Sequence, residues 1–138
     1  MQIKIYELTF SAAHYLAGHP KCGGIHGHTF FIRNFNAESK DASAEMVVDF
    51  GRIKDYFANN WDHKFIIDET ALEFWQEVIA EGILLKNLRT VKGRPTCENI
   101  AWAMSEDLRR LFPDLTYLYF ELYEGPNQGV KVQVKGWK

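Results

Sequence analysis

The ten residues KCGGIHGHTF, at positions 21–30, hold one of the two cysteines and two of the five histidines of this 138-residue chain. The sequence that follows is rich in aromatic and β-branched residues, which predicts a strand that begins near His26 or Gly27. Alternate residues of a strand face the same side, so His26 and His28 lie about 6.6 Å apart on one face. Two imidazoles at that separation can bind one metal ion.

A third ligand for such a metal lies in the segment FSAAH, at positions 10–14. A catalytic zinc site typically has three protein ligands and one open position. His14 ends the first predicted strand, and it lies beside His26 and His28 if the first two strands pair. Two interpretations of these three histidines stay open: they form a zinc site, or they are partly exposed histidines of ordinary strands without a metal.

Cys22 lies four residues before His26, in a loop rich in glycine. The pattern KCGG offers no apolar neighbours with which a merely buried thiol would pack. Two functional interpretations stay open. Cys22 closes the metal site as a fourth ligand, or it stands off the metal as an acid/base group, because a nearby cation favours the thiolate.

Four further side chains are candidates for chemistry. Asp62 and His63 are adjacent, so the imidazole has a carboxylate beside it, as a general acid/base needs. Glu98 lies in the first turn of a predicted helix, where it can also simply complement the helix dipole. Glu124 ends a strand with an apolar row, where it either marks the approach to solvent or accepts two N–H groups from a heterocycle.

Composition narrows the class of protein. Apolar residues make up 46% of the chain and the formal charge is −2, which predicts one domain over residues 1–138 and argues against a dedicated binder of nucleic acid or membrane surfaces. The N-terminal sequence alternates and carries charge, unlike a signal peptide. Two cysteines form no dense disulfide framework, so we expect a cytoplasmic protein.

Hydrophobic periodicity predicts strands before and after a set of helices, which indicates an α+β fold with a largely antiparallel sheet. The first strand has apolar residues on both faces, with Ile3 and Ile5 on one and Leu8 and Phe10 on the other, so both faces are expected to be covered. Asp49 and Thr96 are expected as helix N-caps. The predicted strands are 2–10, one that begins near 26, 45–50, 115–124 and 129–137; the predicted helices are 50–61, 71–82 and 97–112; and residues 84–95 are predicted to be a connection.

Six motifs together resemble the 6-pyruvoyltetrahydropterin synthase and 6-carboxytetrahydropterin synthase family. The resemblance spans nearly the whole chain in the family's motif order, and the spacing C-x3-H-G-H resembles the bacterial carboxytetrahydropterin branch of queuosine biosynthesis. Three features differ from the family pattern: Trp61 precedes Asp62 where leucine is common, the segment 64–94 is long, and YEG replaces the commoner ET. The motifs are FSAAH (10–14), CGGIHGH (22–28), VVDFGRIK (47–54), WDH (61–63), PTCEN (95–99) and YEG (123–125).

The resemblance implies the tunnelling fold, in which a four-stranded antiparallel sheet carries two main helices on one face. Three subunits would close a barrel, and two trimers would stack into a homohexamer with active sites at subunit boundaries. The resemblance also implies a role for each candidate residue. His14, His26 and His28 would ligate zinc, Cys22 would be the catalytic thiol, Asp62 and His63 would complete the proton-transfer machinery, and Glu124 would anchor the pterin ring with Glu98 close to the same pocket.

The implied activity is a zinc-dependent lyase reaction. It converts 7,8-dihydroneopterin triphosphate into 6-carboxy-5,6,7,8-tetrahydropterin, acetaldehyde and triphosphate. His19 and Lys21, which flank Cys22, are candidates for contacts to the triphosphate. Two alternatives stay open: a pyruvoyl-type phosphate lyase on the same scaffold, and a non-catalytic oligomer that binds zinc or a pterin.

Overall fold

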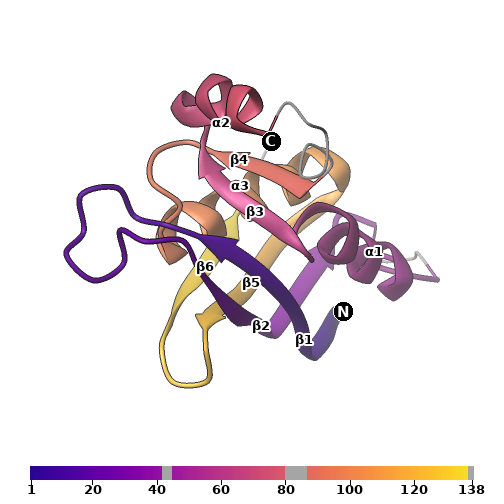
Figure 1. Ribbon diagram of the computed structural model, residues 1–138. Helices are drawn as coiled ribbons and strands as arrows, with labels where there is room; N and C mark the ends of the chain where they lie inside the picture. Colours follow the sequence, from indigo (N-terminus) through magenta and orange to yellow (C-terminus); the bar gives the residue numbers. More distant parts are fainter. Residues whose placement is uncertain (42–44, 80–86, 137–138) are drawn as a thin grey trace.

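The computed structural model describes residues 1–41, 45–79 and 87–136. These residues form one curled six-stranded sheet, with strand order β4-β3-β1-β2-β5-β6, and helices that pack against it (Figure 1). The elements are β1 (Gln2–His14), β2 (His26–Ser39), α1 (Phe50–Asn60), β3 (Lys64–Asp68), a 3-10 turn (Glu69–Ala71), α2 (Leu72–Val78), β4 (Leu88–Val91), α3 (Cys97–Leu111), β5 (Leu115–Glu124) and β6 (Gly129–Lys135).

The predicted four-stranded antiparallel sheet is confirmed, and two short strands extend it. β1, β2, β5 and β6 pair in antiparallel fashion. β3 and β4 add to the β1 edge in parallel, and the sequence analysis did not predict either of them. β4 falls in the segment 84–95, which was predicted to be a connection. The long segment after His63 is therefore part of the sheet.

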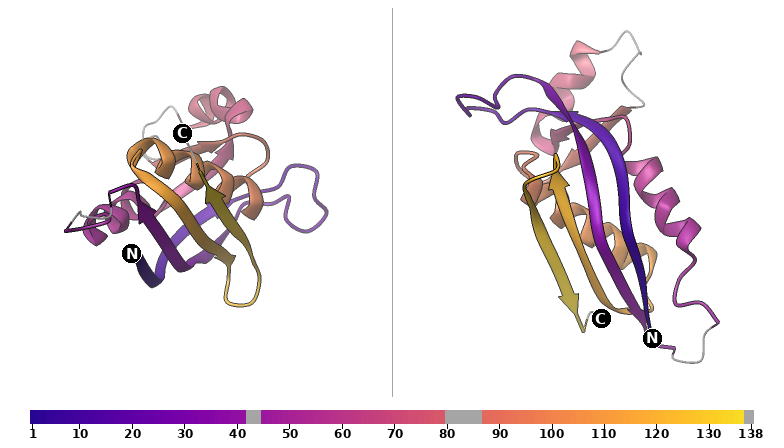
Figure 2. Two further views of the ribbon diagram at one scale, coloured as in Figure 1. Left: turned by 180° about the vertical axis from the view of Figure 1, so that it is seen from behind. Right: turned by 90° about the horizontal axis from the view of Figure 1, so that it is seen from below.

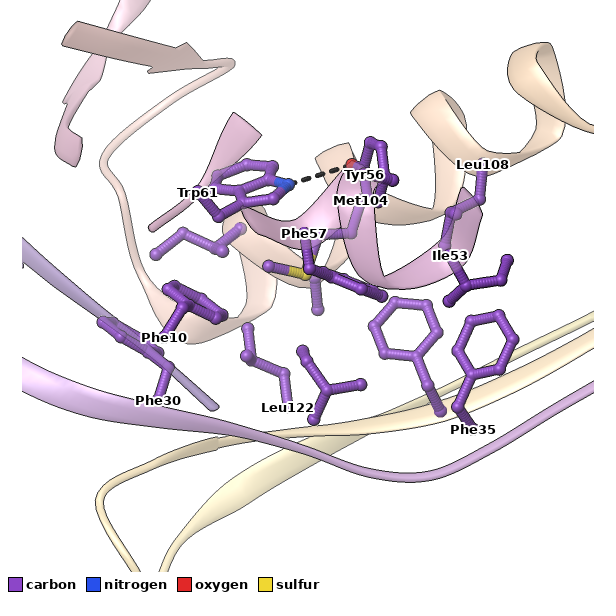
Figure 3. Packing of buried hydrophobic residues seen from close by; sticks show 14 of the residues in the cluster. Phe10, Phe30, Phe35, Ile53, Tyr56, Phe57, Trp61, Met104, Leu108 and Leu122 are labelled. Carbon is purple, nitrogen blue, oxygen red and sulfur yellow. Dashed lines mark hydrogen bonds between the residues drawn. The ribbon is translucent and has the colours of Figure 1, made fainter. Parts of the chain in front are cut away.

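The two long helices cover one face of the sheet, as predicted. Asp49 caps α1 by accepting a hydrogen bond from the Gly51 amide at 2.8 Å, and Thr96 caps α3 through the Asn99 amide at 3.1 Å. Side chains from both helices meet aromatic residues of the sheet in the core (Figure 3). None of the described helices is long and apolar enough to span a membrane.

Two predicted elements need correction. The predicted strand at 45–50 is wrong, because the described residues 45–49 form bends and coil, and α1 begins at Phe50. Val47 and Val48 still pack against the core, which explains their apolar character without a strand. The predicted helix at 71–82 is confirmed only as the shorter α2, and its expected stop at Gly82 lies outside the described residues.

The two apolar rows of the first strand were predicted to lie on opposite faces, and this is wrong. Ile3, Ile5 and Leu8 all pack against the same core, whereas Tyr6 is 74% exposed. The cause is a change of pleat opposite Tyr6. Asn34 has a φ of 52°, and the register between β2 and β5 shifts there. In the first strand, odd-numbered residues face the helices before this point and even-numbered residues face them after it.

A buried polar network holds the chain immediately before Asp62. Trp61 is fully buried, and its indole Nε1–H donates to the Tyr56 hydroxyl at 2.9 Å (Figure 3). The Tyr56 hydroxyl donates to Asp107 at 2.7 Å, and burial together with this carboxylate raises the pKa of Tyr56. The Arg89 guanidinium contacts Asp107 at 2.6 Å and stacks on the Trp61 ring at 4.2 Å. The network joins α1, α3 and β4, which gives Trp61 a structural role.

Candidate metal centre and proton-transfer groups

Pairing of β1 with β2 brings the three predicted histidines together. In the antiparallel register His14 lies opposite His26, and Ala12 lies opposite His28. One ring nitrogen from each histidine lies within 4.8 Å of the others, so all three can reach one ion. The cluster confirms the geometric prediction from the i, i+2 spacing and from the pairing of the first two strands.

Backbone carbonyl groups orient two of the three imidazole rings. Nδ1 of His14 lies 2.7 Å from the Pro95 carbonyl oxygen, and Nδ1 of His26 lies 2.7 Å from that of Gly24. A carbonyl only accepts, so each Nδ1 carries the hydrogen and each Nε2 carries a lone pair. Outer contacts of this kind are typical of histidines that ligate metals.

The positions of the Nε2 atoms suit a bound cation. Nε2 of His14 and Nε2 of His28 are both buried without a hydrogen-bond partner. The nearest carboxylate oxygen, Glu124 Oε1, lies 3.1 Å from the first and 3.6 Å from the second. A cation bound between these nitrogen atoms and the carboxylate would give all of them a partner. Three imidazoles with an adjacent carboxylate are a donor set that suits zinc.

Burial lowers the pKa of His28, outweighing the opposite effect of Glu124. The close contact with the His14 imidazole lowers the pKa of Glu124, although burial acts in the opposite direction. The imidazole is therefore biased towards the neutral form that a metal requires, and the carboxyl towards the ionised form.

Glu98 and Glu124 line one small pocket beside the cluster. Its volume is about 230 Å³. β5 delivers Glu124 at its last residue, as predicted, and the first turn of α3 delivers Glu98. The sequence placed Glu124 at a strand end but did not predict that its carboxylate would touch the histidines. The pocket is lined by Leu16, Thr96, Cys97, Glu98, Glu124, Gln128, Gly129 and Val130.

Cys22 lies in the loop between β1 and β2, which projects beyond the sheet (Figures 1 and 2). Its side chain is partly exposed. The group of ligand atoms that can share an ion, searched over the described part of the chain, contains the three histidines without Cys22. Of the two predicted roles for Cys22, the geometry favours an acid/base group that stands off the metal.

Asp62 and His63 form a hydrogen-bonded pair that is fixed to β1. Asp62 accepts the Ser11 amide at 2.9 Å, and its other oxygen lies 2.9 Å from His63 Nδ1. Burial tends to raise the pKa of Asp62, but the Ser11 amide and His63 hold it below its ordinary value. His63 has a φ of 59°, a rare conformation that its amide hydrogen bond to the Ser11 carbonyl stabilises. The imidazole is 82% exposed.

This pair lies outside the group of ligand atoms formed by the three histidines. His63 lines a wide cleft of about 600 Å³ together with Ser11, Thr29 and one member of the cluster, His28. Ser11 and Thr29 alternate along β1 and β2 with Ala12 and His28, so their side chains face the opposite side of the sheet. The cleft that His63 lines therefore reaches the histidine cluster through His28, but Asp62 and His63 do not belong to the cluster.

The fold is the tunnelling fold, and several solved structures share it. A catalytic-residue mutant of 6-pyruvoyltetrahydropterin synthase from Plasmodium vivax superposes with a TM-score of 0.68 over 98% of both chains at 14% identity. An uncharacterised protein from Wolinella succinogenes gives the same TM-score at 22% identity, over 99% of this chain and 98% of the other.

Sequence comparison agrees with the fold. The family model described as 6-pyruvoyl tetrahydropterin synthase matches residues 4–135, so the chain belongs to that family. The protein named 6-carboxy-5,6,7,8-tetrahydropterin synthase from Rickettsia felis is 32% identical over 91% of this chain and 96% of its own. The dihydroneopterin monophosphate aldolase of Pyrococcus furiosus is 29% identical over 94% of this chain and 95% of its own.

Proposed function

We propose that this protein is a zinc-dependent carbon–carbon lyase, a 6-carboxytetrahydropterin synthase, formed by a single domain over residues 1–138. Its substrate would be 7,8-dihydroneopterin triphosphate, and its products 6-carboxy-5,6,7,8-tetrahydropterin, acetaldehyde and triphosphate. The observation that carries the proposal is the three-histidine cluster, with two buried, unpartnered Nε2 atoms, beside a pocket with two carboxylates. The relatives named for this reaction support the choice of chemistry. We place the activity in the cytoplasm, in queuosine or other 7-deazapurine biosynthesis.

In this proposal His14, His26 and His28 hold the zinc ion. When bound, zinc supplies Lewis acidity to the oxygen atoms of the substrate side chain. The carboxylates of Glu124 and Glu98 bind the amine and amide edge of the pterin, since two N–H donors match two carboxylate oxygens. This contact fixes the ring so that the reacting carbons lie near the histidine cluster.

Proton transfer is assigned to Cys22 and His63. The Cys22 thiolate takes and returns a proton at the side-chain carbons, and His63, oriented by Asp62, acts as the partner acid/base. His63 lies outside the group of three histidines, and its imidazole is 82% exposed. This arrangement supports an active site completed at a boundary between subunits, in a homohexamer made of two trimers. A small pterin triphosphate is the expected partner, with no nucleic acid and no membrane.

Removal of the metal is expected to abolish turnover of 7,8-dihydroneopterin triphosphate, and one equivalent of zinc per chain is expected to restore it. His28→Ala should weaken zinc binding by more than about 100-fold, since even outer-shell partners of a metal site contribute roughly 10–100-fold. Metal content by mass spectrometry and substrate loss by chromatography measure both effects.

The matched control is His63→Ala, which should keep its zinc and still lose turnover. Two results would contradict the proposed metal site. They are metal-free protein that turns over the substrate at the wild-type rate, and His28→Ala protein that binds zinc with wild-type affinity.

A further inference from the structure

The loop between β1 and β2 is organised by the imidazole of His19. Its Nδ1 atom accepts the backbone N–H of Cys22 at 2.8 Å and that of Lys21 at 3.1 Å. Both partners are donors, so Nδ1 must offer its lone pair and the ring hydrogen must lie on Nε2. The imidazole therefore serves as an internal acceptor for the two residues that carry and precede the thiol.

Two further backbone hydrogen bonds of the same loop involve Cys22 and the residue that follows it. The His19 carbonyl accepts the Gly23 amide at 3.1 Å, and the Cys22 carbonyl accepts the Leu16 amide at 2.7 Å. A Cβ atom at Gly23 would lie only 2.7 Å from the His19 carbonyl oxygen, so this contact requires glycine. Both the amide and the carbonyl of Cys22 are thus held, and His19 provides the partner for the amide.

We propose that His19 is a positioning residue for Cys22: it holds the Cys22 amide and thereby sets where the thiol lies relative to the metal centre. The inference rests on the proposed acid/base role of Cys22. The loop has no regular secondary structure around the thiol, and Gly18, Gly23 and Gly24 leave its backbone many conformations. A side-chain acceptor that satisfies two consecutive amides removes much of this freedom.

The proposal differs from the expectation that His19 contacts the triphosphate. A contact to phosphate would use the ring N–H on Nε2, whereas Nδ1 accepts from the backbone of the loop next to the thiol. The two roles use different ring nitrogens, so they can be tested separately. Loss of that acceptor should lower kcat, because displacement of a catalytic group by about 1 Å can reduce the rate roughly 100-fold.

Three substitutions separate the two roles of His19. His19→Ala removes the acceptor and the imidazole. His19→Asn removes the imidazole but keeps a side-chain oxygen that can accept from amides two or three residues ahead. His19→Lys keeps a cation and has no acceptor. For a positioning residue we expect kcat to fall about 10- to 100-fold in the alanine and lysine variants, with KM nearly unchanged, and to recover largely in the asparagine variant.

A readout that does not depend on turnover completes the test. Amide hydrogen exchange of Cys22 and Lys21, measured by NMR on the zinc-loaded protein, should be about fivefold faster or more in His19→Ala, and slower again in His19→Asn. Unchanged exchange would overturn the proposal, and so would a raised KM that lysine restores. If the wild-type protein has no turnover, the proposed function fails, and the exchange rates still decide whether His19 holds the loop.

Discussion

Cys22→Ala protein is expected to lose turnover of 7,8-dihydroneopterin triphosphate by about 100- to 10,000-fold, the usual contribution of a general acid/base group. Its zinc content should remain that of the wild type, because the three histidines form the cluster without Cys22. The thiol supplies the proton-transfer group that the proposed mechanism takes from the β1–β2 loop. Steady-state kinetics and metal analysis on the same preparation measure both quantities.

Cys22→Ser is the matched variant for this experiment. It keeps the size and hydrogen-bonding capacity of the side chain but is far less acidic than a thiol, so it should be nearly as slow as alanine. A Cys22→Ala protein with intact zinc and wild-type turnover would remove Cys22 from the mechanism. A variant that loses zinc along with activity would instead make Cys22 a metal ligand.

Two inactive variants are expected to restore activity when they are mixed. Cys22→Ala and His63→Ala should each be nearly inactive alone. If each active site takes Cys22 from one subunit and His63 from its neighbour, random equimolar mixing should leave about one quarter of the sites with both groups intact. The observation behind this expectation is that His63 lies outside the group of three histidines, with its imidazole 82% exposed.

The mixing experiment needs oligomers that have exchanged subunits, which co-expression and native mass spectrometry can establish. The matched control mixes Cys22→Ala with the double variant Cys22→Ala/His63→Ala, in which no subunit carries an intact Cys22. That mixture should stay inactive. If mixed oligomers of the two single variants form but turnover does not recover, Cys22 and His63 do not meet across a boundary between subunits.

The cluster of three histidines was the most predictable part of the candidate site. Its geometry follows from strand alternation, which puts His26 and His28 on one face, and from pairing of neighbouring strands, which adds His14. The helices were predictable for a similar reason, because Asp49 and Thr96 are local N-cap signals that precede apolar stripes. Local periodicity and local hydrogen bonding decide all of these features.

Features that depend on contacts between distant residues were missed. β3 and β4 are short strands whose pairing with the β1 edge is set by packing in the segment after His63. The pleat change at Asn34 depends on one residue with a positive φ, and alternation alone could not show it. The approach of Glu124 to His14 likewise needs β1, β2 and β5 in one sheet. The position of Asp62 and His63 beside β1 follows from their contacts with Ser11.

The most direct measurement of the central claim is product identification by mass spectrometry. Zinc-loaded protein is incubated with 7,8-dihydroneopterin triphosphate, and the account predicts 6-carboxy-5,6,7,8-tetrahydropterin together with acetaldehyde. A pyruvoyl product without acetaldehyde would contradict the lyase proposal and favour the phosphate-lyase alternative on the same scaffold. Unchanged substrate in the presence of fully zinc-loaded protein would contradict a catalytic role on this pterin. The remaining hypothesis would then be a non-catalytic oligomer that binds zinc or a pterin.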